Sequence, residues 1–174
     1  RGYFDPAITS SGIRQGGVLY LVESASVAED GSLVRGDLDD RAPLPKHELM
    51  RHSSHDPVDR QQMAATGLMR ANSVSTEGVG TAFAPLGFNQ DDGFVISKEF
   101  AESMPTIGRD GKPRPQRIGD KMHDLHGNKG VVSLVVDREM DMDTAREQRI
   151  DNIVRLFAAN PELDVVASPH SLVS

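Results

Sequence analysis

The chain has 174 residues, in which 26 Asp and Glu outnumber 19 Lys and Arg, so its formal net charge is −7. Hydrophobic residues make up 37% and charged residues 26%, a balance typical of a globular domain and not of a disordered chain. No apolar run approaches the ~18 residues of a membrane-spanning helix, and the absence of Cys excludes disulfides and thiolate metal sites. We therefore expect one cytoplasmic domain with no membrane partner. The acidic charge argues against a general nucleic-acid-binding protein.

Short apolar, β-branched runs bounded by Gly, Asp or Pro predict strands. They are Val18–Val22, Val79–Ala84, Phe94–Ser97, Val131–Val136 and Asp164–Ala167. Continuous apolar runs of this kind are typical of strands that are buried on both faces. The polar segment Gly36–Arg60, with three Pro and three His, is predicted to be a loop or an extended arm.

Two helices are predicted between the later strands. A short helix lies over Ser97–Ser103, with its first residue as the N-cap. A longer helix begins at Asp143 or Thr144, because Thr144 and Glu147 have the spacing of a capping box, and it ends at Asn160 before a proline. Its apolar residues fall on one face at helical spacing: Ile150, Ile153, Val154 and Phe157. The predicted fold is therefore mainly β with helical insertions, a small β-rich barrel.

The clearest chemistry lies in the segment Arg117–Ser133. Lys121 and Lys129 stand eight residues apart in a loop that leads into a predicted strand. Three glycines punctuate this loop: Gly119, Gly127 and Gly130. Lysine is a compact charge suited to phosphate, and backbone N–H groups in Gly-rich turns bind anions. The pattern predicts a phosphate-binding loop. A solvated hairpin with ordinary surface lysines is the alternative, because the spacing matches neither the P-loop nor the Rossmann motif.

Three blocks of the sequence resemble the β subunit of multisubunit DNA-directed RNA polymerases. Gly119–Met122 and His126–Val131 resemble the GDKM…HGNKGV motif of that family. Ala82–Ser97 resembles its segment AFMPW-GYN-ED-xxVIS, and Asp164–Ser174 resembles its DIVLNPxGVPS stretch. The resemblance does not extend to residues 1–76.

The resemblance implies a double-psi β-barrel that faces a second barrel, carried by a β′-like partner, across a polymerase active centre. Within a single domain of residues 1–174, the barrel core would comprise residues 77–138 and 162–174. Residues 1–76 would form N-terminal strands and a polar arm, and residues 141–160 a helical insertion.

The resemblance also implies roles for particular residues. Lys121 and Lys129 would contact phosphates at the RNA 3′ end and near the incoming nucleoside triphosphate (NTP), with template nucleic acid bound alongside. Asp91 and Asp92 would lie on the side of the second Mg²⁺ ion and the NTP. The first Mg²⁺ belongs to three carboxylates of the β′ barrel. This fragment of a nucleotidyltransferase would therefore hold no metal alone and would be inactive alone. Further motif residues would support the lysines: Gly119, Asp120, His126, Gly127, Asn128 and Gly130.

The chain departs from the family pattern at several places. Asp91 stands where the family usually has Glu, and Leu125 stands where it usually has Arg. The large flap region between Asp92 and Lys121 is missing, which favours a compact phage-like or plasmid-like enzyme. The chain also begins at Arg1 without Met and stops just before a position where the family has an Arg, so we expect a piece of a longer protein. The alternative is a catalytically dead barrel that binds nucleic acid or a polymerase. An unrelated small-molecule enzyme on the same fold is a third possibility.

Two other patterns invite a metal-binding interpretation. Glu139, Asp141 and Asp143 have the spacing of a DxDxD loop, but they precede a predicted helix, where acidic residues complement the helix dipole. We favour that role for them. Two His pairs also have metal-compatible spacing, His52/His55 and His123/His126. Neither pair has a clear third ligand, so zinc is not expected, and His126 is expected to orient its loop by hydrogen bonding.

The acidic charge is unevenly distributed along the chain. Residues 105–130 carry six Lys or Arg and three Asp, a net charge of +3. The proposed working loop is therefore locally basic, which suits a domain that touches a few phosphates at one point.

Overall fold

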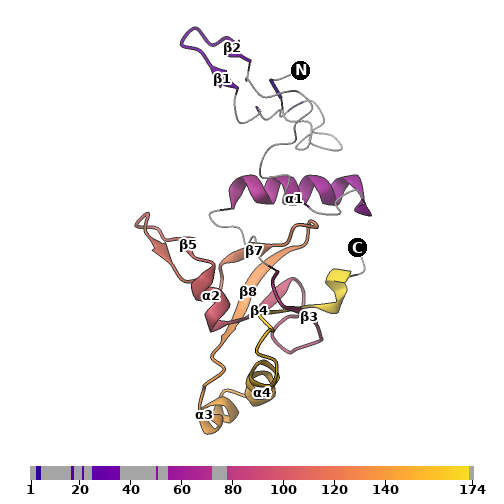
Figure 1. The fold of residues 1–174 in the computed structure, drawn as a ribbon, viewed down its shortest axis with the longest axis vertical. Coiled ribbons are helices and arrows are strands. Elements are labelled where there is room, and N and C mark those ends of the chain that lie inside the picture. The colour runs from indigo at the N-terminus through magenta and orange to yellow at the C-terminus, as the bar shows by residue number, and fades with distance from the viewer. Residues whose placement is uncertain are drawn as a thin grey trace. The chain divides into compact units, whose positions relative to one another are not determined.

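The computed structural model describes residues 3–4, 17, 21, 25–35, 50, 55–71 and 78–172. The chain divides into two compact units (Figure 1). Unit 1 comprises Arg1–Ala71 and His123–Asn128, and unit 2 comprises Asn72–Met122 and Lys129–Ser174. Within the described ranges, no helix is long and apolar enough to cross a membrane.

Unit 1 contains a short hairpin in which β1 (Ser26–Val27) pairs antiparallel with β2 (Leu33–Val34). Its turn closes at Gly31, which has φ +83° and donates a backbone hydrogen bond to the Ala28 carbonyl (2.9 Å). The predicted strand Val18–Val22 lies outside the described residues except for Leu21, which forms an isolated bridge with Phe4.

The helix α1 (Val58–Arg70) was not predicted, and it corrects the expectation that the polar arm continues through Arg60. Pro57 immediately precedes it, a position where the missing N–H of proline costs no helical hydrogen bond. Ala64, Ala65 and Leu68 are fully buried, so a narrow apolar stripe holds this otherwise polar helix.

Unit 2 is built on a five-stranded mixed sheet, and the described strands do not close into a barrel. The strand order is β3-β9-β4-β8-β7. The bounds are Thr81–Phe83 for β3, Val165–Ala167 for β9, Gly93–Ser97 for β4, Lys129–Val136 for β8 and Lys121–His123 for β7. β3 runs parallel to β9 and β4 parallel to β8, whereas β4 and β9 are antiparallel. Four of the predicted strands are thus confirmed within a mixed α/β fold.

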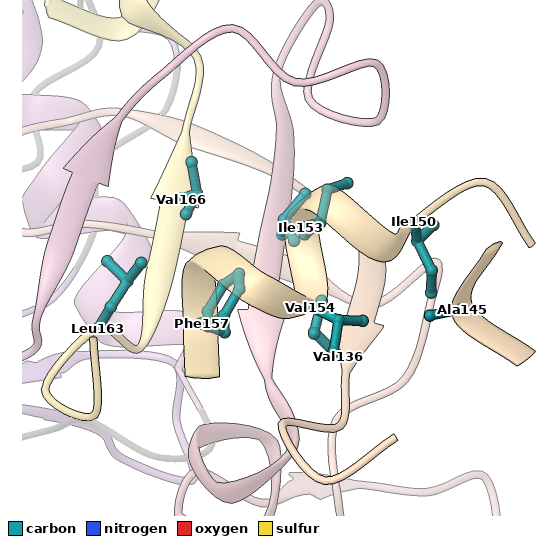
Figure 2. Close-up of a cluster of buried hydrophobic side chains, with 9 residues drawn as sticks. Val136, Ala145, Ile150, Ile153, Val154, Phe157, Leu163 and Val166 are labelled. Carbon is teal, nitrogen blue, oxygen red and sulfur yellow. The ribbon is translucent and has the colours of Figure 1, made fainter. Parts of the chain in front are cut away.

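The central strands β4 and β9 are buried on both faces, as their continuous apolar runs predicted. On one face, Val95 and Val166 join a core with residues of α3 and α4 (Figure 2). On the other face, Ile96 and Val165 pack in a second core with Phe100 of α2. Alternation of side chains along each strand assigns neighbouring residues to opposite cores.

The helix α2 (Lys98–Ser103) confirms the predicted short helix, and the Ser97 hydroxyl accepts the Phe100 N–H as its N-cap (3.1 Å). A second hairpin follows, in which β5 (Thr106–Ile107) pairs antiparallel with β6 (Pro113–Arg114). A short 3-10 helix over Pro169–Leu172 comes after β9.

The predicted long helix is in fact two helices, α3 (Met142–Glu147) and α4 (Asp151–Ala159). Arg149 has φ +59°, its N–H donates to the Arg146 carbonyl (3.0 Å), and the Ile150 N–H donates to the Ala145 carbonyl (2.9 Å). This pair of hydrogen bonds is a Schellman motif, which ends a helix. The predicted apolar face is confirmed, since Ile150, Ile153, Val154 and Phe157 all lie in one core (Figure 2).

The N-cap of α3 also differs from the prediction. Asp141 is the cap, and its carboxylate accepts the backbone N–H groups of Asp143 (3.2 Å) and Thr144 (3.1 Å). These hydrogen bonds lower the pKa of the Asp141 carboxyl, the Thr144 N–H contributing most. Asp141 therefore serves the start of a helix, as we favoured for this acidic cluster.

Candidate functional site

Lys121 and Lys129 are exposed on one face of the β7–β8 hairpin. The Val132 N–H donates to the Asp120 carbonyl (2.8 Å), which places Lys121 opposite Val131 in the antiparallel register. Lys129 is two residues before Val131 and shares its face, because side chains alternate along a strand. The burial pattern agrees, since all three side chains are exposed. The two lysines are thus diagonal neighbours, a relationship that typically separates residues by about 7–8 Å.

A bulge at Gly119 fixes this register. Gly119 has φ +93°, and its N–H donates to the Val132 carbonyl (2.8 Å), so Gly119 and Asp120 together oppose Val132. A Gly in the left-handed region at this position is a G1 bulge. The Asp120 N–H also donates to the Arg117 carbonyl (3.0 Å), which closes a turn with Gly at its third residue. Gly119 therefore serves the turn and the bulge at once.

The start of β8 lies directly against the Asp91–Asp92 turn that precedes β4. The Val131 N–H donates to the Asp92 carbonyl (3.0 Å), and Gly93 is the register partner of Val131. A Cβ atom on Gly130 would overlap the same carbonyl oxygen, so only glycine fits there. Because β4 and β8 are parallel, both begin at the same end of the sheet. The backbone of Asp92 therefore lies against Gly130 and Val131, next in the chain to Lys129.

The acidic turn is held in shape by Asn89, which is 1% exposed. Its side chain accepts the Leu86 N–H (2.7 Å) and donates to the Ala84 carbonyl (2.7 Å). Asp91 and Asp92 remain exposed, and Asp91 adopts φ +55°, which Asp tolerates better than most residues. Asn89 thereby closes the loop of residues 84–89, which leads into the acidic turn. The sequence prediction missed this role, although Asn89 lies within the block that resembles the polymerase segment.

Asp120, predicted as a supporting residue, has a structural role, because both of its carboxylate oxygens are hydrogen-bonded within the chain. Its two carboxylate oxygens each accept a hydrogen bond from the Arg114 guanidinium (both 2.7 Å), and one also accepts the Arg117 N–H (2.8 Å). The hydrogen bonds from Arg114 hold the pKa of the Asp120 carboxyl below its usual value. Asp120 thereby links β6 to the turn in front of Lys121.

The remaining motif residues, His126, Gly127 and Asn128, belong to unit 1. Asp124 organises their loop, because its carboxylate accepts the His126 N–H (2.9 Å) and both the backbone N–H and the side-chain amide of Asn128 (2.8 and 2.6 Å). His126 Nδ1 lies 2.9 Å from a carboxylate oxygen of Asp56. This contact fits the expectation that His126 orients the loop.

Arg60 of α1 covers the same loop. Its guanidinium donates to the Gly127 carbonyl (3.2 Å) and to the Asn128 side-chain oxygen (3.0 Å). Gly127 has φ +85°, and a Cβ there would lie 2.6 Å from the Arg60 carbonyl oxygen. Arg60 and Asp56 are therefore loop-positioning residues that the sequence prediction missed, since the resemblance does not extend to residues 1–76.

The described residues do not form a complete metal site. Among them, no group of three or more His, Asp or Glu side chains is placed to hold a metal ion. His52 lies outside the described residues, so the His52/His55 pair is not described. Mg²⁺ in nucleotide-processing sites is bound through one or two carboxylates together with substrate phosphates. Asp91 and Asp92, adjacent and exposed, fit that partial role and not that of a closed protein cage.

Comparison with protein-family models, with curated proteins and with solved structures finds no match to this chain.

Proposed function

We propose that this chain is a β-subunit-like domain of a DNA-directed RNA polymerase that supplies phosphate-binding lysines to nucleotidyl transfer. The observation that carries the proposal is the exposure of Lys121 and Lys129 on one face of a hairpin whose β8 strand starts beside the Asp91–Asp92 turn. These are the four residues that the sequence resemblance singles out. They were chosen from the sequence alone, so the contact between the start of β8 and the acidic turn is independent support.

The chemistry of phosphoryl transfer suits this arrangement. Negative charge develops on the attacking and leaving oxygens, and fixed cations stabilise it without covalent chemistry. Lys121 and Lys129 would bind phosphates of the RNA 3′ end and of the NTP. Asp91 and Asp92 would face a Mg²⁺ ion that the NTP carries, and the bound ion would supply further neutralisation of phosphate charge. The bulge at Gly119 and the pairing of β4 with β8 hold these groups at one end of the sheet.

The proposal includes a double-psi barrel as the finer fold. The support is the strand order, in which β9 lies between β3 and β4 although it is the last strand in the chain. Non-consecutive neighbours and two parallel pairs require long crossing connections of the kind that such barrels contain. A β′-like barrel, as a separate subunit or in a longer chain, would complete the active centre with its own carboxylates.

The test is a primer-extension assay on the complete polypeptide that carries this chain, purified with its partner barrel. Lys121→Ala and Lys129→Ala should each lower the elongation rate by about tenfold or more. Lys98→Ala is the matched control, because it removes an exposed lysine of α2 that pairs with Asp137 (2.8 Å) away from the proposed site. Elongation at the control rate by both lysine variants would exclude the site assignment.

A second function, a catalytically dead barrel that binds nucleic acid or a polymerase, is favoured by one feature. Leu125 replaces a cation that the family usually carries next to the HGNKG motif. A purified complex that binds template and NTP but incorporates no nucleotide, in the wild type as in the variants, would support this second function instead.

A further inference from the structure

The β5–β6 hairpin of unit 2 carries a concentration of positive charge that the proposed active centre does not use. Between Gly108 and Arg117 the chain has four basic residues and one acidic residue: Arg109, Lys112, Arg114, Arg117 and Asp110. Figure 1 shows the hairpin projecting from the sheet of unit 2. This net charge of +3 stands against −7 for the whole chain.

The turn of this hairpin is tightly constrained. The Gly111 N–H donates to the Gly108 carbonyl (3.0 Å), and the Gly108 N–H donates to the Lys112 carbonyl (2.8 Å). Gly111 has φ +74°, so the loop is a β-turn followed by a left-handed glycine, a common hairpin connection. Asp110 accepts the Lys112 N–H (3.2 Å) and is thereby committed to the turn. Arg109 and Lys112 are consequently displayed on a backbone that is already ordered.

Three of the four cations are available to a ligand. Arg114 is committed to Asp120, as described above. Over the described part of the chain, no ion pair involves Arg109, Lys112 or Arg117, and all three side chains are exposed. They line a hollow of about 490 Å³ together with Arg114 and the hairpin backbone. Asp110 is the one acidic residue in the lining, so the hollow is predominantly basic.

We infer that the β5–β6 hairpin binds the phosphodiester backbone of a nucleic-acid strand through Arg109, Lys112 and Arg117. Arginine matches phosphate oxygens with two parallel hydrogen bonds, and lysine adds a mobile point charge. A Cβ at Gly111 would meet nothing within 4 Å, so a strand has space to approach the turn there. The segment Gly108–Arg117 has no aromatic residue, so it offers no platform for base stacking, and binding should be indifferent to sequence.

An acidic peptide would meet the same charges, but the geometry favours a phosphodiester. The cations come from both sides of one turn and surround a single hollow, which suits successive phosphates of one strand. The inference does not depend on the proposed function, because it uses neither Lys121 nor Lys129.

The chain contains its own control for the fold of this hairpin. The β1–β2 turn has the same hydrogen bonds, from Gly31 N–H to the Ala28 carbonyl and from Ala28 N–H to the Ser32 carbonyl (both 2.9 Å). It has Glu29 and Ser32 at the positions of Arg109 and Lys112. The double substitution Arg109→Glu with Lys112→Ser therefore gives β5–β6 side chains that an identical turn already accommodates.

The experiment is fluorescence anisotropy of the 174-residue chain with a labelled single-stranded RNA, the DNA of the same sequence, and the corresponding DNA duplex. About three phosphate contacts predict that log K falls with log salt concentration with a slope of roughly −2 for single strands and roughly −2.7 for the duplex. The double variant should weaken binding about tenfold or more and, by removing two of the three contacts, reduce the magnitude of the slope by about 1.4 for single strands and about 1.8 for the duplex. Comparing the affinities for the RNA, the single-stranded DNA and the duplex identifies which nucleic acid the hairpin prefers.

Arg155→Glu serves as the matched charge control for the single variant Arg109→Glu. Arg155 is an exposed residue of α4, and both substitutions change the net charge equally. Circular dichroism and thermal melting check that the variants fold. Equal loss of binding in the two single variants, wild-type binding by the double variant, or absence of binding by the wild type would each overturn the inference. Equal affinity for a poly-glutamate peptide would also overturn the inference, because it would show that the hairpin binds acidic proteins.

Discussion

Gly130 lies directly against the carbonyl oxygen of Asp92, at a separation that leaves no room for a side chain. This contact lies where β4 and β8 begin, and it sets the acidic turn against the start of β8. The close approach is thus a structural requirement of the candidate site.

Gly130→Ala should destabilise unit 2, because the new Cβ would push β8 away from the Asp92 carbonyl. Overpacking of this kind costs about 1–3 kcal/mol in the free energy of unfolding. Urea unfolding measures the change. Gly87→Ala is the control, since a Cβ at Gly87 meets nothing within 4 Å, and the two variants should differ clearly. Equal free energies of unfolding for Gly130→Ala and Gly87→Ala would show that β8 can move away from the Asp92 carbonyl without cost.

Asn89→Leu should destabilise the loop before β4, because the Leu86 N–H and the Ala84 carbonyl both lose their side-chain partner. Each buried polar group left unsatisfied costs about 1–3 kcal/mol. Asn89→Asp is the informative comparison, because it keeps an acceptor for Leu86 and loses only the donor to Ala84. Its unfolding free energy should fall between those of the wild type and Asn89→Leu. If Asn89→Asp were less stable than Asn89→Leu, the proposed role of the Asn89 amide would be wrong.

Stability should fall as acid protonates Asp120. The folded-state pKa of this carboxyl lies below its unfolded value of about 3.9, because the Arg114 hydrogen bonds favour the charged form. Its contribution is therefore complete above the unfolded pKa and disappears as the pH drops through the folded pKa. Urea unfolding of the wild type and of Asp120→Asn measures it, and the two curves should converge at low pH. A difference between them that persists unchanged at low pH would exclude this linkage.

Arg149→Gly should stabilise the junction between α3 and α4. Arg149 occupies the left-handed position of a Schellman motif, where an L-residue costs about 1–2 kcal/mol and glycine does not. Thermal unfolding should show a higher midpoint for Arg149→Gly. Arg149→Ala is the control, because it removes the same side chain but keeps a Cβ, and it should bring no comparable gain. An equal rise of the unfolding midpoint in both variants would attribute the stabilisation to loss of the Arg149 charge and not to its backbone conformation.

The sequence predicted β3, β4, β8 and β9, because their apolar runs are continuous and both faces of β4 and β9 are buried. It did not predict β5, β6 or β7, which are two or three residues long and have no such run. It predicted the longer helix less well. Arg149 gives no glycine signal, so the break between α3 and α4 could not be recognised from a C-cap pattern. The helix α1 was missed because only Ala64, Ala65 and Leu68 mark its buried stripe, and alanine is a weak hydrophobic signal.

The candidate site was predictable in its residues and not in its geometry. Lys121 and Lys129 could be chosen from the motif, but their common face depends on the register of the hairpin, and the Gly119 bulge sets that register. Two of the three Asp-Gly pairs, Asp30-Gly31 and Asp110-Gly111, were hairpin signals that the sequence did contain. They would have predicted both turns and placed the basic residues around the second.

The bulge at Gly119 has a consequence for how this hairpin can change. Because the Asp120–Val132 pairing sets the register at the base of the hairpin, Lys129 remains two residues before the partner of Lys121 whatever the length of the tip. Insertions or deletions between Asp124 and Asn128 should therefore leave both ammonium groups on the same side of the sheet. A single-residue deletion at Gly119, by contrast, would remove the bulge and change the turn between Arg117 and Asp120, on the other side of that pairing.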